Sequence, residues 1–419
     1  MKPPSSTERL QFLPVFSVAI VVLTIGAAFG VLVGRGALIG MLSATVMTTF
    51  TALIGGSRYG ISSPTGPMSA AIAVILMMEK DWASAHHSDI DPIMLMNVTV
   101  ALAGVILFIM TLFKIHRLVS YVPQLAISGF VNGIAVLIIL SQLQSTTGIS
   151  NWVLLVITFL LSFGASRFCN HYNHLVWKVL ASSFGVMVVM AATAYFFNLP
   201  VEYLDISDSL NWSQLALPNI SLLTWDTIGI ISILALELAF IALLDTLLTA
   251  VIMDKKTKTS TNHMRELTGQ SLSFLGVSLF GGLPGAQSTV PSMMMVEEKN
   301  HHLHSKKLLA FYCIILCLIF AGFLQFIPSA VFGGLIIKIA LDVADTTSFK
   351  TVLTSKNPKR HAQLFLILAV LISTVMISLN LAVIGCTLFF VLWNQWSPKK
   401  WNIPDLIPLT QSEGLSDEI

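Results

Sequence analysis

The sequence predicts an all-α polytopic membrane protein, and three observations lead to that fold class. They are its composition, a series of apolar stretches of span length, and a one-sided distribution of lysine and arginine. Of its 419 residues, 55% are hydrophobic and only 11% are charged, against about 25% charged in an ordinary soluble domain. A soluble core stops growing well below this length, so the excess apolar residues need lipid as their solvent.

Fourteen apolar stretches follow one another along the chain, and we expect each to enter the membrane as a helix. Four of them, 66–78, 268–280, 285–296 and 329–343, are shorter than the roughly 20 residues that a helix needs to cross a bilayer. The first stretch is too long for a signal peptide, so we interpret it as the first span. The stretches are 12–34, 37–55, 66–78, 93–113, 118–141, 151–168, 176–197, 226–253, 268–280, 285–296, 306–325, 329–343, 361–378 and 381–397.

Lysine and arginine gather on one side of the membrane when the N-terminus is placed in the cytoplasm and the spans alternate. Of the 23 basic residues, 21 then lie inside and only Arg35 and Lys80 lie outside. The sequence therefore predicts a protein of the cell inner (plasma) membrane with both termini, residues 1–11 and 398–419, in the cytoplasm. The acidic loop 198–225 lies outside and separates a first half, 12–197, from a second half, 226–397.

Two motifs recur in both halves. Pro64 and Pro284 each follow a Gly-Gly pair and precede a short apolar stretch, while Pro123 and Pro328 each precede a glycine by six residues. Because each half holds seven spans, matching spans run in opposite directions, as in inverted-topology repeats with interrupted helices. We therefore expect 14 transmembrane segments in a 7+7 inverted repeat, with two half-helices inside the membrane. Ordinary tight turns between short helices are the alternative.

Half-helices that begin inside a membrane attract anions. Their first N–H groups have no partners, and each N-terminus carries roughly half a positive charge. Two such ends facing each other form an anion site without lysine or arginine. With no catalytic triad or cofactor motif in the sequence, we expect a secondary transporter of a small inorganic anion that is neither an enzyme nor dependent on a cofactor. The residues expected to bind the anion are Thr65, Gly66, Ser69, Gly285, Ala286, Gln287, Ser288 and Thr289.

The span 226–253 contains two acidic residues, Glu237 and Asp245. Carboxylates at such a depth usually mark the path of an ion or a proton. Thr249 lies one turn beyond Asp245, about 40° around the helix, so the two share a face. A carboxylate, a hydroxyl and nearby unwound carbonyls suit Na⁺, and a proton on Asp245 is the competing coupling ion. Glu237 is an alternative proton carrier or a hydrogen-bonded structural group.

Three stretches carry a further resemblance. They are Gly55–Met68 with its Ser63-Pro64-Thr65-Gly66-Pro67 run, Val122–Leu143, and Asp245–Pro284. Together they resemble the SulP sulfate-permease family of anion transporters over about residues 12–397. The resemblance implies a core and a gate domain, usually in a homodimer, with short helices starting near Pro67 and Gly285 that meet at the substrate. It also implies a sodium site at Asp245 and Thr249, beside the anion-binding stretch 287–289, as in the bicarbonate-transporting branch.

Two departures from the family pattern affect the expected function. The sequence ends before the cytoplasmic STAS domain that the family usually carries, so we expect the membrane domain only. No arginine lies near Pro291, where many members have one, which favours bicarbonate over the divalent sulfate. The leading hypothesis is anion symport with Na⁺ or H⁺ by alternating access. A nucleobase or dicarboxylate permease of the same architecture, using Glu237, and an anion channel are the alternatives.

Overall fold

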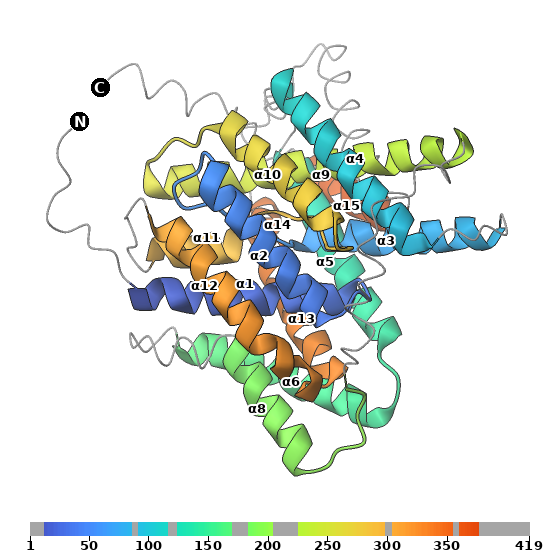
Figure 1. The fold of residues 1–419 in the computed structure, drawn as a ribbon, viewed down its shortest axis with the longest axis vertical. Coiled ribbons are helices and arrows are strands. Elements are labelled where there is room, and N and C mark those ends of the chain that lie inside the picture. The colour runs from blue at the N-terminus through green and yellow to red at the C-terminus, as the bar shows by residue number, and fades with distance from the viewer. Residues whose placement is uncertain are drawn as a thin grey trace, which may run out of the picture.

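The computed structural model describes residues 12–85, 91–115, 124–169, 183–203, 225–297, 304–354 and 360–376 (Figure 1). The expected N-terminal segment, the last predicted span 381–397 and the C-terminal tail lie outside these residues. The described chain is helical except for two three-residue strands, β1 (Ile61–Ser63) and β2 (Ala286–Ser288). The helices are α1 (Phe12–Leu32), α2 (Ala37–Ile54), α3 (Gly66–Ala85), α4 (Pro92–Leu112), α5 (Gln124–Ser145), α6 (Ile149–Cys169), α8 (Ser183–Phe196), α9 (Trp225–Thr257), α10 (His263–Ser278), α11 (Thr289–Glu297), α12 (Ser305–Phe320), the 3-10 helix η4 (Ala321–Phe326), α13 (Ser329–Val343), α14 (Thr346–Thr354) and α15 (Arg360–Met376).

Several of these helices have the length and composition of membrane spans. Within the described residues, six segments, in α1, α2, α4, α5, α9 and α12 with η4, are long and apolar enough to cross a bilayer, and α6, α8 and α15 contain shorter apolar helices. On α12, large apolar side chains face outward: Leu318 is 74% exposed and Phe311 is 55% exposed. Such a surface needs lipid around it. The expected all-α, multi-pass membrane fold is therefore confirmed.

The ends of the helices follow from local sequence. Asp91 caps α4, since its side chain accepts a hydrogen bond from the N–H of Ile93 at 2.9 Å, and a proline occupies the first turn. Asn262 caps α10 in the same way through the N–H of Arg265 at 3.1 Å. Glycine allows α1 and α2 to cross closely, because a Cβ added to Gly40 would lie 2.8 Å from the Cα of Gly30.

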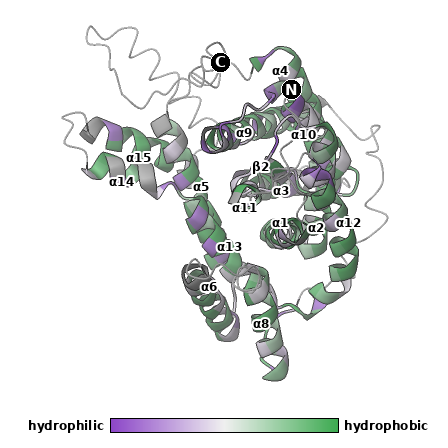
Figure 2. Ribbon diagram, turned by 90° about the vertical axis from the view of Figure 1, so that its left-hand side faces the viewer, coloured by the Kyte–Doolittle hydropathy of each residue, from purple (hydrophilic) through white to green (hydrophobic). Residues whose placement is uncertain are grey.

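The helices form two bundles, which Figure 2 shows on opposite sides of the molecule. In one bundle, α4 packs against α9 and α10, and α12 packs against α1 and α2, with α3 and α11 enclosed near them. In the other, α5 packs against α13 and α15, and α6 packs against α8 and α13. The bundles meet mainly where α1 contacts α13 and α8 and where α3 contacts α5 and α13. The two strands lie inside the first bundle.

Several boundaries differ from the sequence-based expectation; α10, for example, begins at His263 instead of residue 268, and α9 ends at Thr257 instead of residue 253. Helix α3 continues to Ala85 instead of ending at residue 78, and Glu79 within it is buried and accepts a hydrogen bond from the Thr99 hydroxyl of α4 at 2.8 Å. The predicted stretch 285–296 is not one helix but β2 followed by α11. Helix α14 follows α13 where no element was predicted, since its alternation of polar and apolar residues is too short to read as a span.

Candidate functional site

Two breaks in the helical chain come together at the centre of the first bundle. After α2 the chain extends through residues 55–60 into β1, and after α10 it extends through residues 279–285 into β2. The strands pair antiparallel in the register Ile61 with Ser288, Ser62 with Gln287, and Ser63 with Ala286. Segments more than 220 positions apart in sequence are thereby joined. The turn alternative, in which the two breaks are unrelated, is wrong.

A short helix leaves each strand almost at once. Helix α3 begins at Gly66, three residues after β1, and α11 begins at Thr289, directly after β2. Pro67 and Pro291 lie in the first turns, where a missing N–H costs no hydrogen bond. The second helix starts four residues later than expected, because Ala286–Ser288 pairs as a strand first. Since the strands are antiparallel, the two positive helix ends lie at opposite ends of one short ribbon.

The backbones of the two breaks touch at Gly285. A Cβ added there would collide with the carbonyl oxygen of Ser63 and would lie 2.7 Å from the Cα of Pro64. The carbonyl oxygen of Gly285 accepts a hydrogen bond from the side-chain amide of Gln270 on α10. Gln270 was not among the expected site residues, although it lies within the stretch Asp245–Pro284 that carries the family resemblance. Only glycine permits this approach of two main chains.

We call the paired strands and the helix starts beside them, residues 61–69 and 285–289, the strand crossing. The strand crossing contains buried polar side chains that have no hydrogen-bond partner among the described residues. Both polar atoms of the Gln287 side chain and the hydroxyls of Ser62 and Ser69 are in this state, and all three residues are 0% exposed. Ser288 and Thr65 are also buried. Buried polar groups in proteins nearly always have partners, so an unpartnered group needs a ligand, an ion or water to satisfy it. Gln287, Ser62 and Ser69 thus mark a place where a polar ligand fits.

Helix α9 lines the crossing with its predicted polar face. The Thr65 hydroxyl donates a hydrogen bond to Oδ2 of Asp245 at 2.7 Å, and the hydroxyls of Thr249 and Thr289 are 3.1 Å apart. Each of these contacts joins α9 to one of the two breaks. Thr289 is exposed and Asp245 is partly exposed, whereas Thr249 is buried.

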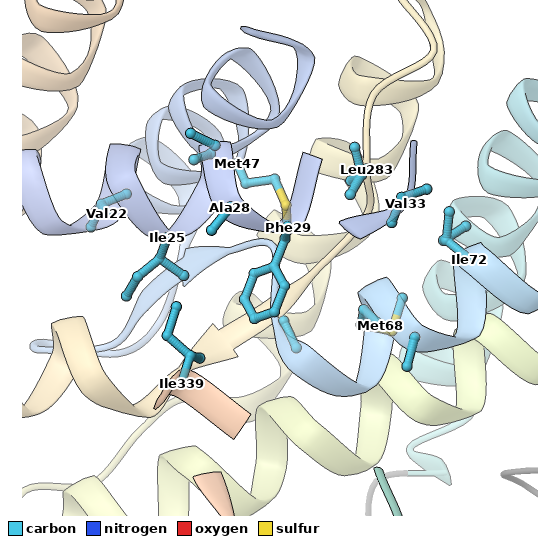
Figure 3. Close-up of a cluster of buried hydrophobic side chains, with 14 of the residues drawn as sticks. Val22, Ile25, Ala28, Phe29, Val33, Met47, Met68, Ile72, Leu283 and Ile339 are labelled. Atoms are coloured by element: carbon cyan, nitrogen blue, oxygen red, sulfur yellow. The ribbon is translucent and has the colours of Figure 1, made fainter. Parts of the chain in front are cut away.

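Glu237 lies at a different depth from the crossing. It precedes Asp245 by eight residues on α9, which corresponds to about 12 Å along the helix. Apolar side chains surround the other side of the crossing: Figure 3 shows Phe29 of α1, Met68 of α3 and Ile339 of α13 in one cluster, with Leu283 from the break before β2 nearby. Phe29 and Ile138 also flank Gly66. The first turn of α3 is thus shielded by both bundles.

Oxygen atoms dominate the possible ligands for a cation at this site. The described residues contain no group of three or more His, Cys, Asp or Glu side chains that could hold a transition metal. The Asp245 carboxylate, the hydroxyls of Thr249 and Thr289 and the strand carbonyls are hard oxygen donors, which suit Na⁺. Asp245 and Thr249 therefore lie together as predicted, and their role as a cation site remains a prediction.

Comparison with known proteins places this architecture in a family. The sequence profile of the sulfate permease family matches residues 12–154 and 149–357. The chain belongs to the sulfate permease family. This membership confirms the resemblance expected from the sequence.

Relatives in the family carry names for two substrates. The bicarbonate transporter BicA of Picosynechococcus sp. is 27% identical over 352 residues, which are 79% of this chain and 61% of BicA. The putative sulfate transporter YbaR of Bacillus subtilis is 24% identical over 348 residues, which are 82% of this chain and 68% of YbaR. The chain therefore spans less than two thirds of the length of BicA.

Solved structures show the same fold. The transmembrane domain of a cyanobacterium bicarbonate transporter BicA matches with a TM-score of 0.74 and 24% identity, covering 89% of this chain and 96% of that chain. The murine anion transporter Slc26a9 in its inward-facing state matches with a TM-score of 0.73 and 15% identity, covering 91% and 67%. At these identities the likeness establishes the fold alone.

Proposed function

We propose that this chain is a secondary active transporter of a small inorganic anion. The observation that carries the proposal is the crossing of β1 and β2, with a helix N-terminus directly after each strand. The free amides of the first turns, together with the unpartnered Gln287, Ser62 and Ser69 side chains, offer hydrogen-bond donors to an anion inside the membrane. The proposed substrate-binding residues are those expected from the sequence, Thr65, Gly66, Ser69 and Gly285–Thr289, which belong to β2, to the helix starts and to the residues next to them.

The donors at the crossing favour a singly charged anion. Two helix ends supply a total of about one positive charge, and hydroxyl and amide groups add neutral donors. A divalent anion such as sulfate would need a further cation to balance its charge on leaving water. The name of the BicA relative agrees with bicarbonate as substrate, while that of YbaR keeps sulfate as the second candidate.

The coupling cation is proposed to bind at Asp245 and Thr249. Both side chains contact the breaks, through Thr65 and Thr289, so a cation held there would neutralise Asp245 beside the anion. Binding of either ion would then favour binding of the other. Na⁺ fits the oxygen donors, and a proton on the Asp245 carboxylate is the alternative coupling ion.

Alternating access is proposed to move one bundle against the other. The packing supports the 7+7 inverted repeat, in which α1, α4, α5 and α6 of the first half correspond to α9, α12, α13 and α15 of the second. The contact between α1 and α12 then corresponds to the contact between α9 and α4. The contact between α5 and α15 corresponds in the same way to the contact between α13 and α6. Gly129 on α5 and Gly334 on α13 occupy equivalent close contacts, each with an added Cβ 2.6 Å from a carbonyl oxygen. We further propose that one bundle is a core that carries the site and that the other is a gate, within a total of 14 spans. The protein is proposed to form a homodimer in the plasma membrane, with both termini in the cytoplasm.

Uptake by proteoliposomes tests the function. Purified protein is reconstituted and supplied with radiolabelled bicarbonate, sulfate or chloride, each with and without an inward Na⁺ gradient and an inward proton gradient. We expect gradient-driven accumulation of one anion, with bicarbonate first. Accumulation of none of the three under any gradient would contradict the proposal, as would uptake of uracil or succinate alone. Single-channel currents far above carrier turnover would identify a channel.

The hydroxyl of Thr249 provides a test of the cation site. Thr249→Val keeps the side-chain volume but removes the group that meets Thr289, so we expect the Na⁺ concentration for half-maximal uptake to rise by roughly tenfold. The control is Thr193→Val, whose hydroxyl bonds the carbonyl of Val189 in its own helix. An unchanged Na⁺ dependence in Thr249→Val would remove this residue from the cation site.

A further inference from the structure

The break before β1 is held by two buried charged side chains from the second half of the chain. Oε2 of Glu266 on α10 accepts hydrogen bonds from the N–H groups of Gly56 and Ser57, both at 2.8 Å. Nζ of Lys306, at the start of α12, donates to the carbonyl of Ser57 at 3.1 Å. Glu266 is 1% exposed and Lys306 is 8% exposed. The Glu266 carboxylate and the Lys306 ammonium group therefore both bind the backbone of residues 56 and 57.

At the start of the same peptide segment there is no room for a side chain at position 55. A Cβ added to Gly55 would lie 2.7 Å from Oε2 of Glu266 and 3.3 Å from Nζ of Lys306. Asn262, the cap of α10, adds a backbone hydrogen bond from its N–H to the carbonyl of Gly56 at 3.2 Å. Residues 55–57 are thus fixed to α10 and α12 immediately before the chain enters β1.

The break before β2 is held in the corresponding way by the first half of the chain. Nε of Arg35, between α1 and α2, donates to the carbonyl of Gly281 at 3.2 Å, and Arg35 is 9% exposed. Gly281 has a φ of +66°, a conformation that favours glycine. Two residues later, the hydroxyl of Ser43 on α2 accepts a hydrogen bond from the N–H of Leu283 at 2.8 Å. Asp91, at the start of α4, attracts the Arg35 guanidinium.

We propose that Glu266 with Lys306, and Arg35, are positioning residues that hold β1 and β2 in register for the anion, each break being anchored by charged side chains from the opposite half. The proposal rests on the transport function proposed above. Because the charges contact the breaks and not the paired residues, they act on the anion through the strands.

The short length of the strands is the reason such anchors are needed. Only three residues of each strand pair, and an isolated ribbon of two strands is at best marginally stable. A slip of one residue would also turn Gln287 and Ser62 to the opposite face. The register must therefore be imposed from outside the ribbon. Carboxylate, ammonium and guanidinium groups do this well, since hydrogen bonds to charged groups are about twice as strong as neutral ones.

Four variants test the first anchor. Glu266→Gln and Lys306→Met each remove one charge, and the double variant Glu266→Gln with Lys306→Met removes both, so that no unbalanced buried charge is left. Lys307→Met is the matched control, because Lys307 is the exposed neighbour of Lys306. For each variant, KM and maximal rate of anion uptake are measured, with the rate divided by the amount of folded protein from size-exclusion chromatography.

We expect KM to rise roughly tenfold in both the single and the double variants, with the maximal rate per folded protein within about twofold of the unmodified protein. Arg35→Met should raise KM in the same way, and Arg35→Lys should recover part of it. Lys307→Met should change neither quantity. An unchanged KM in the double variant, with only the amount of folded protein reduced, would show that the pair is merely structural and would overturn the proposal.

Hydrogen–deuterium exchange gives a readout that does not depend on transport. In Glu266→Gln, the amides of residues 55–60, in the break that the anchor holds, should exchange faster, while those of residues 279–285, in the break before β2, keep their rates. Equal rates in both proteins would overturn the anchoring. Failure of the unmodified protein to take up any anion would count against the transport function alone. Normal uptake with an unchanged KM in Glu266→Gln would count against the anchors alone.

Discussion

Gly285→Ala is expected to reduce anion uptake strongly while the protein still inserts into the membrane. The added methyl group would collide with the carbonyl oxygen of Ser63 and lie 2.7 Å from the Cα of Pro64, and neither backbone atom can rotate away. Relief requires β2 to move from β1, which separates the two helix ends that are proposed to bind the anion. Overpacking of this kind costs about 1–3 kcal/mol in a well-packed core, so we expect a loss of uptake of about 5- to 150-fold.

Two further glycine variants make this prediction specific. In Gly66→Ala the added Cβ would meet the end of the flexible Ile138 side chain at 3.2 Å, which can shift, so we expect a smaller loss. In Gly164→Ala, on α6, no atom lies within 4 Å of the added group, and uptake should remain normal. Uptake of radiolabelled anion per folded protein is the measurement. Equal activity in Gly285→Ala and Gly164→Ala would mean that the contact between the breaks does not matter.

Asp245→Asn is expected to abolish cation-coupled uptake without unfolding the protein. The amide oxygen of the new side chain can still accept the hydrogen bond from Thr65, so the link between α9 and the first break is kept. The negative charge that would bind Na⁺ or a proton is lost. We expect uptake driven by the cation gradient to fall by at least about tenfold, as for other buried carboxylates on ion paths.

Glu237→Gln is the matched comparison, because it changes the other acidic residue of α9 at a different depth. If Asp245 binds the coupling ion, Glu237→Gln should keep the dependence of uptake on the cation gradient. Uptake is measured with Na⁺ and proton gradients imposed separately on the same liposomes. Normal gradient dependence in Asp245→Asn together with its loss in Glu237→Gln would transfer the coupling role to Glu237.

Features with a local cause were predicted well from the sequence. The helix breaks at Pro64 and Pro284 follow from residues that cannot continue a helix, and the shared face of Asp245 and Thr249 follows from helical periodicity. The structure shows both features, with Asp245 bonded to Thr65 and Thr249 beside Thr289. Motif spacing alone also suggested that the two breaks are related.

Features that depend on distant partners were not predicted. The strands β1 and β2 contain three residues each, and each finds its hydrogen-bond partner in the other half of the chain, so neither has a periodic pattern of its own. The start of α11 at Thr289 instead of Gly285 follows from that pairing. Glu266 and Lys306 look like solvent-facing charges in the sequence, since only the fold brings Gly56 and Ser57 between them. The predicted stretch 66–78 stops before Glu79 in the same way, because the partner of this side chain, Thr99, lies on another helix.

The central claim is that an anion binds between the two helix starts at the strand crossing. The most direct test is a structure of the protein solved in the presence of the anion that it transports. We predict density for that anion within hydrogen-bond distance of the first-turn amides of α3 and α11, next to the Gln287 and Ser69 side chains. Density for the transported anion at another place in the membrane, with none at the crossing, would contradict the claim.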